Sequence, residues 1–563
     1  VSAGYIIKSE TGKENVYEIS DILNVKETYK NLGSSVVPVI GGEPQQCTPD
    51  CNQAINIAYP IDYAIIQRNL EGDENKGDIK IRGNAVLNCA LEANFNNNPS
   101  WTELGNANGD FNFNLANQNV GQGLLRLRQK GCLEDVSVSN VGIGDIFVIA
   151  GQSNALLQGD PNDKQYLSNS PFPNLYVGVN YKNNQWVKAD DYLGSSTFSS
   201  AYPHMINYLM QDSNLPDMPI GLIQTAVGGK KILQWIKGSH DNSCGCDAYP
   251  YVCGSYVETC YDKMYTQVNT ATDGVNKFKG MIWFQGETDV SGGTTKTDYI
   301  TYFNTLYNDL GLGSVTGDFE FDGIVSAQLG SITCCKSGTC GYCERSKMDA
   351  IRAAQADLWQ DSGSANALAK NYRGPVTIDI SLSGLNNVHF CTSDERERLS
   401  ERWYVALKHA FYDSSIDYKG PVVTSVQCGT ESNTILININ EVSSLQGVET
   451  SKGWRIFNGL TVINDDAISL TKISDSQIKL TYTGAINSGT LTFASFHDVN
   501  SGPRDDNAQI GGCGNNYCVQ NPICILGTWQ SVVKDSSQFS INGNNIQLNL
   551  PLQPFSLSFG PCA

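Results

Sequence analysis

The sequence has 563 residues, of which 57 are acidic and 38 basic, giving a formal net charge of −19. A chain of this length exceeds a single hydrophobic core, so we expect two to four domains. Its acidic residues are spread along the chain, which argues against nucleic acid and anionic membranes as partners. No apolar run approaches the roughly 18 residues of a membrane span.

Short runs in which apolar and polar residues alternate occupy the first 140 residues. Examples are Asp78–Arg82 and Gly123–Arg128, and turns rich in Asn and Gly separate such runs. Alternation with a period of two is typical of strands that bury one face. We therefore predict a β-rich, β-sandwich-like domain over residues 1–140.

Strand-like and helix-like patterns alternate between residues 141 and 418. Helical spacing of apolar residues runs from Ile300 to Leu310, and Thr392 with Glu395 forms a capping-box pattern before another helix. This alternation predicts a parallel sheet covered by helices on both faces, with functional residues beyond the carboxyl ends of its strands. The strand candidates are Asp145–Ala150, Pro219–Thr225, Gly280–Phe284, Gly323–Gln328 and Gly374–Ile380.

The remaining segment, residues 419–563, again consists of short strand-like runs. Gly420-Pro421 marks its beginning, and Thr434–Asn438, Gln477–Tyr482 and Gly489–Phe493 are strand candidates. We predict a second β-sandwich-like domain here.

The first predicted strand of the central domain ends at Gly151-Gln152-Ser153-Asn154. This order places a serine hydroxyl on the tight turn after a buried strand, where α/β enzymes display nucleophiles. A serine on a turn often serves only the turn itself. A catalytic role for Ser153 therefore depends on a base and on oxyanion donors from other loops.

The loops after the second and third predicted strands carry suitable donors. Gly228 and Gly229 let the backbone approach a ligand and direct an N–H at it, although paired glycines also suit a plain tight turn. Gln285 could donate its side-chain amide to an oxyanion, with Glu287 and Asp289 bracing the site. The alternative for this third loop is a solvated polar connection.

His389 is the best candidate for a general base among five histidines. It lies between the fifth predicted strand and the helix that follows, so the topology brings it to the same edge as Ser153. His204 lies within a helical pattern and is expected to be structural.

The chain contains 18 cysteines, many of them in local groups such as Cys47/Cys51 and Cys334/Cys335/Cys340/Cys343. Clustered cysteines in loop-like sequence predict disulfides and an oxidising, secreted or cell-surface location. Val1 is then expected to be a mature N-terminus left after removal of a signal peptide. Zinc is the alternative for the group from Cys334 to Cys343, but no histidine accompanies it. We expect neither a metal nor a cofactor.

Acceptors for N-glycosylation are missing from the sequence. The one Asn-x-Ser/Thr pattern, Asn98-Pro99-Ser100, has a proline at its middle position, which blocks it. A bare surface would suit close packing against copies of the same chain, so self-association is one expectation.

Together these segments resemble the SGNH hydrolases, and among them the sialate O-acetylesterase family of carbohydrate esterases. The resemblance implies a three-layer, flavodoxin-like parallel-sheet core over residues 141–418, flanked by N- and C-terminal β-sandwich-like domains. It covers most of the chain and rests on Val138–Asn154, Thr225–Gly229, Trp283–Asp289, Ile351–Gln355 and Leu550–Phe555.

Carried over residue by residue, the resemblance makes Ser153 the nucleophile and His389 the general base. The Ser153 N–H, an N–H at Gly228 or Gly229, and the Gln285 amide would form the oxyanion hole. The implied reaction is a two-step acyl transfer that releases acetate from O-acetylated glycans without a cofactor.

One departure from the family concerns the carboxylate that orients the base. The family places an aspartate two or three residues before the histidine, where this sequence has Asn386 and Asn387. Such a carboxylate fixes the tautomer of the imidazole and stabilises its charged form. Asp379 and Asp394 are nearby substitutes, but neither has the family's spacing.

The departure leaves three hypotheses. The first is an active secreted carbohydrate O-acetylesterase. The second is a catalytically weakened or inactive structural, self-assembling protein built on the same scaffold, and the third is a lectin-like glycan binder. Retention of Ser153, Gln285 and His389 favours the first.

Overall fold

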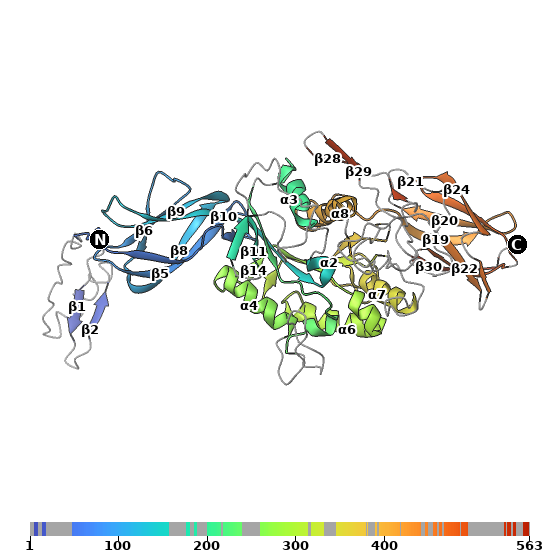
Figure 1. The fold of residues 1–563 in the computed structure, drawn as a ribbon, viewed down its shortest axis with the longest axis horizontal. Coiled ribbons are helices and arrows are strands. Elements are labelled where there is room, and N and C mark those ends of the chain that lie inside the picture. The colour runs from blue at the N-terminus through green and yellow to red at the C-terminus, as the bar shows by residue number, and fades with distance from the viewer. Residues whose placement is uncertain are drawn as a thin grey trace, which may run out of the picture.

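The computed structural model shows an elongated molecule with a β-rich unit at each end and an α/β unit between them (Figure 1). The residues that it describes are 5–8, 14–17, 48–156, 176–180, 185–188, 200–215, 218–238, 259–313, 317–330, 345–378, 380, 389–390, 393–416, 418–440, 445–446, 448, 454–458, 461–463, 467–484, 486–493, 534–535, 538–541, 544–547 and 555–561.

Parallel strands form the centre of the α/β unit, as the sequence predicts. They are β10 (Val136–Gly151), β13 (Ile220–Gln224), β15 (Gly280–Phe284), β17 (Ile324–Gln328) and β18 (Asn371–Val376). They pair in the order β13-β10-β15-β17-β18, which in chain order is 2-1-3-4-5. This is the flavodoxin-like order, in which the crevice between the first and third strands is the usual ligand site.

The fifth strand differs from its prediction in extent. It begins at Asn371 rather than Gly374 and ends at Val376 rather than Ile380. Gly374 and Pro375 were expected to mark its start, but the register with β17 shifts between Ser326 and Gln328 and accommodates them within the strand.

Helices cover both faces of this sheet, with α3 and α8 on one side and α4, α6 and α7 on the other (Figure 1). Successive side chains of β15 show why, because they point to opposite faces. Trp283 packs against Phe303 of α6, whereas Phe284 packs against Trp403 of α8. The helices are α2 (Ser153–Leu156), α3 (Tyr202–Gln211), the 3-10 helix η1 (Ile232–Trp235), α4 (Cys260–Thr272), α5 (Glu287–Gly292), α6 (Lys296–Asp309), α7 (Arg345–Leu358) and α8 (Ser393–Phe411).

The N-terminal β unit has two groups of strands around one apolar cluster. A three-stranded sheet of β3 (Ile55–Tyr59), β5 (Lys76–Val86) and β8 (Asn108–Asn119) forms one side. The other side comprises β4 (Ile65–Gln67), β6 (Leu91–Phe95), β7 (Thr102–Gly105), β9 (Gly121–Gln129) and the first half of β10. The cluster between them includes Ile79, Ile81, Leu115, Leu125 and Leu127.

Strand β10 belongs to both units, because its first half pairs with β9 and its second half with β13 and β15. The boundary that the sequence predicts between residues 140 and 141 falls inside this strand. The N-terminal unit is therefore joined to the parallel sheet by continuous hydrogen-bonded strand rather than by a linker.

A buried carboxylate, Asp145, fixes the junction. Its oxygens accept hydrogen bonds from Arg68 Nε at 2.8 Å, Arg68 Nη2 at 3.1 Å, Gln67 Nε2 at 3.1 Å and Tyr412 Oη at 2.8 Å. The loop after β4 is thereby tied to the start of the parallel part of β10 and to the end of α8.

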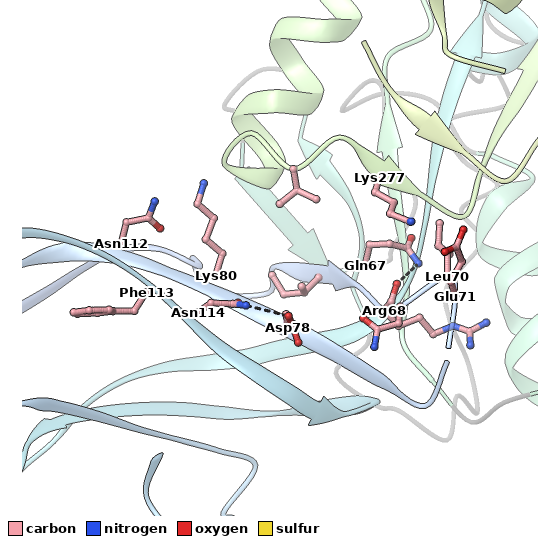
Figure 2. Close-up of a pocket in the computed structure, with 13 residues that line it drawn as sticks. Gln67, Arg68, Leu70, Glu71, Asp78, Lys80, Asn112, Phe113, Asn114 and Lys277 are labelled. Carbon is pink, nitrogen blue, oxygen red and sulfur yellow. Dashed lines mark hydrogen bonds between the residues drawn. The ribbon is translucent and has the colours of Figure 1, made fainter. Parts of the chain in front are cut away.

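A cavity of about 730 Å³ opens beside this junction (Figure 2). Asn112, Asn114 and Lys80 from the β5–β8 pair line one wall, and Lys277 of β14 (Lys277–Phe278) lines the other. Lys80 also pairs with Asp273 at the end of α4, which links the two units. The cavity lies at the amino-terminal end of the parallel strands, so it does not belong to the edge at which Ser153 lies.

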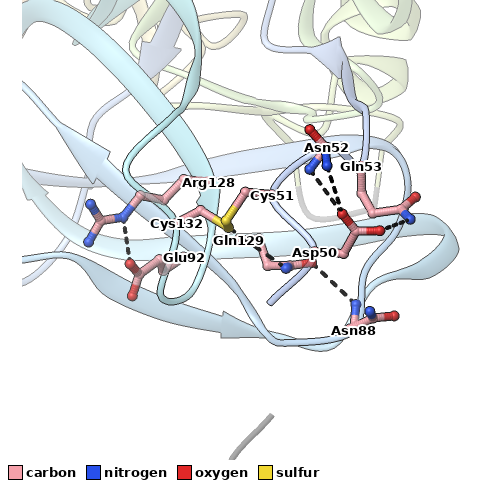
Figure 3. The surroundings of a disulfide bond; sticks show 9 residues. All are labelled: Asp50, Cys51, Asn52, Gln53, Asn88, Glu92, Arg128, Gln129 and Cys132. Carbon is pink, nitrogen blue, oxygen red and sulfur yellow. Dashed lines mark hydrogen bonds and ion pairs between the residues drawn. A yellow bond between two sulfur atoms is a disulfide. The ribbon is translucent and has the colours of Figure 1, made fainter. Parts of the chain in front are cut away.

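A disulfide between Cys51 and Cys132 closes the N-terminal unit (Figure 3). The two cysteines are 81 residues apart, so Cys51 pairs outside its local group. Cys89, Cys260 and Cys428 are disulfide-bonded as well, which confirms the prediction of disulfides. The group from Cys334 to Cys343 lies outside the described residues.

The C-terminal β unit contains two four-stranded sheets that share an apolar cluster. Trp359, Val376 and Ile378 of the α/β unit belong to this cluster, so the two units pack tightly. The predicted strands appear as β20 (Thr434–Asn440), β25 (Gln477–Tyr482) and β26 (Gly489–Phe493). One sheet is completed by β19 (Val422–Cys428) and β24 (Ile468–Ser474), and the other by β22 (Trp454–Asn458), β23 (Thr461–Ile463) and β30 (Phe555–Phe559).

Short pairs of strands complete the described chain. They are β1 (Tyr5–Lys8) with β2 (Glu14–Tyr17), β11 (Tyr176–Asn180) with β12 (Gln185–Lys188), β14 with β16 (Glu320–Phe321), β21 (Leu445–Gln446) with β27 (Lys534–Asp535), and β28 (Gln538–Ile541) with β29 (Asn544–Gln547). Among the described helices, none has the length and apolar content that crossing a membrane requires.

Candidate active site

Ser153 lies directly beyond the carboxyl end of β10, which pairs with β15 up to Gly151. Gly151 makes the turn possible, since its φ is +125° and a Cβ there would lie 2.1 Å from the carbonyl oxygen of Phe284. A residue with a side chain would be both strained and in collision. Ser153 then begins the short helix α2 and is 8% exposed, so its hydroxyl is close to the surface but largely enclosed.

The residue before Ser153 holds the neighbouring loop. The carbonyl oxygen of the Gln152 side chain accepts hydrogen bonds from the backbone N–H of Gly286 at 3.3 Å and of Thr288 at 3.1 Å. These N–H groups lie at the start of α5, where a helix has no partners of its own for them. Gln152 thus caps α5 and couples it to the serine turn.

The residues after Ser153 are held as well. The carbonyl oxygen of Ala155 accepts hydrogen bonds from Gln224 Nε2 at 2.9 Å and Tyr202 Oη at 3.1 Å. Asn154 donates from Nδ2 to Glu287 Oε1 at 2.5 Å. Backbone and side-chain bonds therefore fix the turn on both sides of Ser153.

Gln285, the predicted oxyanion donor, is completely buried at the end of β15. Its Nε2 donates to the backbone oxygen of Lys230 at 3.0 Å, to Gln152 Oε1 at 3.3 Å, and to Asp289 Oδ2. A primary amide has two hydrogens to donate. An oxyanion would therefore have to compete with these internal acceptors.

Asp289 anchors the same loop. Its carboxylate also accepts hydrogen bonds from the backbone N–H of Ile232 at 2.9 Å and from Thr294 Oγ1 at 2.8 Å. Burial raises the pKa of Asp289, and the bonds from Gln285 and Thr294 oppose that rise. The Asp289 carboxyl thus joins the end of β15, α5 and the first residue of η1.

The glycine pair lies on the loop after β13. The backbone N–H of Val227 donates to the Gly151 carbonyl oxygen at 3.0 Å, which brings this loop to the serine turn. Gly228 is half-buried and Gly229 is exposed, with a φ of +71° that favours glycine. Their N–H groups therefore lie on a loop that is hydrogen-bonded to the serine turn.

His389 is also brought to this edge of the sheet. It is 6% exposed, and the ring of Phe390 beside it lies 6.0 Å from the ring of Phe284. Phe284 is in turn the register partner of Gly151. One aromatic contact and one strand pair thus connect the histidine segment to the serine turn.

The carboxylate expected beside His389 is not among the described residues. Asn386, Asn387 and Asp379 lie outside them. Asp394 is described, but its side chain is 69% exposed and pairs with Arg398 at 3.3 Å, so it points to solvent. Of the other histidines, His204 packs edge-on against Tyr208 within α3, as a structural residue would.

Sequence reasoning gave no role to three polar residues of the site. Gln224 and Tyr202 hold the turn, and Gln355 of α7 donates to the Gln285 carbonyl oxygen at 2.8 Å. The position of Gln224 at the end of a buried strand and that of Gln355 in the segment Ile351–Gln355, which resembles the family, were available signals. A tyrosine within a helix, as Tyr202 is, signals nothing by itself. No group of three or more metal-ligating side chains occurs among the described residues.

One segment of the chain matches a known protein family. Residues 143–318 match the family model described as carbohydrate esterase, sialic acid-specific acetylesterase. No curated protein sequence gives a significant match. The matched segment includes the Ser153 turn, the glycine pair and the loop from Gln285 to Asp289.

Among solved structures, the chain is similar to a carbohydrate acetylesterase from Xanthomonas citri, with 16% identity and a TM-score of 0.55 over 90% of this chain and 99% of that one. NanS matches with 15% identity and a TM-score of 0.32 over 47% of this chain and 96% of its own. A protein from Arabidopsis thaliana matches with 18% identity and a TM-score of 0.31, over 47% and 98% respectively.

The likeness to the Xanthomonas citri protein extends over 90% of this chain and concerns the fold. The match to the family model is confined to residues 143–318, which include the serine turn and its supporting loops. Within the α/β unit, this segment resembles the sialic acid-specific acetylesterases among the carbohydrate esterases.

Proposed function

We propose that the protein is a carbohydrate O-acetylesterase that releases acetate from O-acetylated glycans. The observation that carries this proposal is the position of Ser153, on a braced turn at the crevice between β10 and β15, within the segment that matches the esterase family. A serine so placed is held in one orientation for attack on a bound ester.

In the proposed reaction, Ser153 Oγ attacks the acetyl carbonyl carbon while His389 takes the hydroxyl proton. Collapse of the tetrahedral intermediate breaks the bond to the sugar oxygen, which leaves with the proton from His389. Water then attacks the acetyl-enzyme, again with His389 as base, and acetate departs. The contact between Ser153 and His389 is part of this proposal.

The oxyanion hole would consist of the Ser153 N–H and an N–H at Gly228 or Gly229. Gln285 adds a third donor if its amide leaves the backbone oxygen of Lys230 or the side chain of Gln152. Its bond to Asp289 would then keep the amide oriented. We assign the role of orienting His389 to an oxygen acceptor of the segment that contains Asn386 and Asn387.

We also propose that the protein is secreted or exposed at the cell surface, which its several disulfides support. We propose that both flanking β units are β-sandwich-like. Self-association stays a prediction from the sequence.

The test is acetate release from O-acetylated N-acetylneuraminic acid and from acetylated polysaccharides. Ser153→Ala and His389→Ala should each lower kcat by at least about 10³-fold, since the groups of such a site act as a unit. Ser137→Ala is the matched control, because Ser137 is an exposed serine in the N-terminal half of β10. A wild-type rate no higher than that of Ser153→Ala would refute the proposal.

A further inference from the structure

Glu287 is a buried carboxyl at the active site for which the proposed acyl transfer has no use. It is 3% exposed, at the first position of α5, two residues after Gln285. Taking a carboxylate out of water costs several kcal/mol unless hydrogen bonds replace the water. The position of such a group beside the nucleophile therefore calls for a physical reason.

The hydrogen bonds of Glu287 are incomplete. Oε1 accepts from Asn154 Nδ2 at 2.5 Å, whereas Oε2 is buried and makes no hydrogen bond to the described residues. Buried carboxylates that serve only stability normally have both oxygens satisfied. Glu287 is thus poorly adapted as a purely structural group.

The side chain that bonds to Glu287 is informative, because Asn154 is the residue next to Ser153. A hydrogen bond from an amide to an ionised carboxylate is shorter and about twice as strong as one between neutral groups. The bond crosses from β15–α5 to β10–α2, over a sequence separation of 133 residues. It therefore fixes the distance between the two loops that border the crevice.

We propose that Glu287 is a positioning residue whose ionised carboxylate holds Asn154, and through it orients Ser153 for attack. This inference rests on the proposed function, since it assigns Glu287 a part in the same reaction. Glu287 touches neither the reacting atoms nor a bound ligand in this scheme. Its contribution is to keep the serine turn in the reactive geometry.

Protonation of Glu287 would weaken this brace. Burial, with a smaller contribution from the Asp289 charge, raises the pKa of the Glu287 carboxyl to about 7, although hydrogen bonds from its own backbone N–H and from Asn154 act to lower it. The carboxyl is therefore ionised above about pH 7, and the strong form of the bond is lost as the pH falls below that value. Charged groups on the surrounding elements are Asp289 on α5, Lys230 and Lys231 before η1, Lys347, Asp349 and Arg352 on α7, and His389 before α8.

The experiment measures Ser153 reactivity directly, as the rate constant of its labelling by a fluorophosphonate. Glu287→Gln retains an acceptor oxygen and removes the charge, and Asn154→Ala removes the donor. Each should slow labelling and lower kcat for p-nitrophenyl acetate by about 10- to 100-fold with little change in KM, as expected for a misplaced nucleophile. The double variant should be no slower than the slower single variant, because both changes break one bond. Glu134→Gln, which removes an exposed charge in the N-terminal unit, should behave as wild type.

The pH profile separates this role from a merely structural one. Protonation of Glu287 in the wild type should cost about the same 10- to 100-fold as Glu287→Gln, so log kcat/KM should show a partial drop as the pH falls through about 7. In Glu287→Gln this partial drop should be missing, while the rest of the acid limb stays. An unchanged drop near pH 7, wild-type labelling in Glu287→Gln, or additive losses in the double variant would each overturn the inference. Absence of Ser153 labelling in the wild type would instead refute the proposed function.

Discussion

The two ends of the parallel part of β10 each hold a buried carboxyl, and the two are satisfied very differently. Asp145, at the amino-terminal end, is completely buried and receives four hydrogen bonds from Arg68, Gln67 and Tyr412. Glu287, beside the carboxyl-terminal end, receives one side-chain bond, from Asn154. The two carboxyls are thus buried to a similar extent, but Asp145 accepts many more side-chain hydrogen bonds than Glu287 does.

This difference separates structural from functional use of a buried charge. At the junction, the Arg68 guanidinium neutralises the Asp145 carboxylate, and both carboxylate oxygens accept hydrogen bonds. Removal of either side chain would therefore leave the other charge buried without this ion pair. At the serine turn, burial without full pairing raises the pKa of Glu287 to about 7, which costs stability at neutral pH. Active sites commonly retain such costs because activity depends on them.

The largest effect is expected at the junction. Asp145→Ala should lower the free energy of unfolding by about 3–5 kcal/mol, because it leaves the buried Arg68 guanidinium with only the half-exposed Glu74 carboxylate as a charged partner. Urea denaturation followed by tryptophan fluorescence would measure it. The double variant Asp145→Leu/Arg68→Met should recover most of the loss, since an apolar pair needs no neutralisation. A loss below about 1 kcal/mol for Asp145→Ala would remove the contrast between the two ends.

A somewhat smaller effect is expected from opening the N-terminal unit. Replacement of Cys51 and Cys132 by serine should lower its stability by about 2–4 kcal/mol, because the disulfide closes a long loop that is otherwise free in the unfolded chain. Limited proteolysis of the N-terminal unit would detect the change. Esterase activity should persist at low temperature, since Ser153 lies at the far end of β10. Loss of activity in a folded variant would contradict this separation of the two ends.

Local patterns explain how much of this fold could be predicted. The strands from Gly280 to Phe284 and from Gln477 to Tyr482 were predicted with their observed bounds, because apolar periodicity and flanking turn residues both lie within the strand. The prediction of Ser153 as a nucleophile has the same basis, since a buried run ending in Gly-Gln-Ser-Asn is a local signal. The prediction of His389 as the base rests on its place between the fifth predicted strand and the following helix.

Contacts between distant segments could not be predicted. The pairing of Cys51 with Cys132 and the bond from Asn154 to Glu287 join residues 81 and 133 positions apart, and no pattern in the sequence links them. The continuity of β10 was missed because Asn140 and Gly142 resemble turn residues, yet they lie within a strand whose register shifts at that point. Such features depend on the packed structure rather than on local preference.

An effect of opposite sign, which reaches its full size only above pH 7, concerns Glu287. Because the pKa of Glu287 rises from 4.5 to about 7 on folding, the folded state retains a proton that the unfolded state has lost between these values. The stability associated with the protonated carboxyl is therefore complete below pH 4.5 and is lost as the pH rises through 7, up to about 3 kcal/mol in total. Glu287→Gln cannot ionise, so it should match the wild type at pH 4 and exceed its free energy of unfolding at pH 8.

Urea denaturation of both proteins at pH 4, 6 and 8 would measure this divergence, with Glu134→Gln as the control for loss of an exposed charge. A variant that is more stable at pH 8 yet less reactive at Ser153 would show that the burial of Glu287 is maintained for reactivity at the expense of stability. If the free energy of unfolding changed with pH in the same way for the wild type and Glu287→Gln, the Glu287 carboxylate would be as well stabilised by hydrogen bonds as Asp145. The two buried carboxyls would then differ only in where they lie along β10.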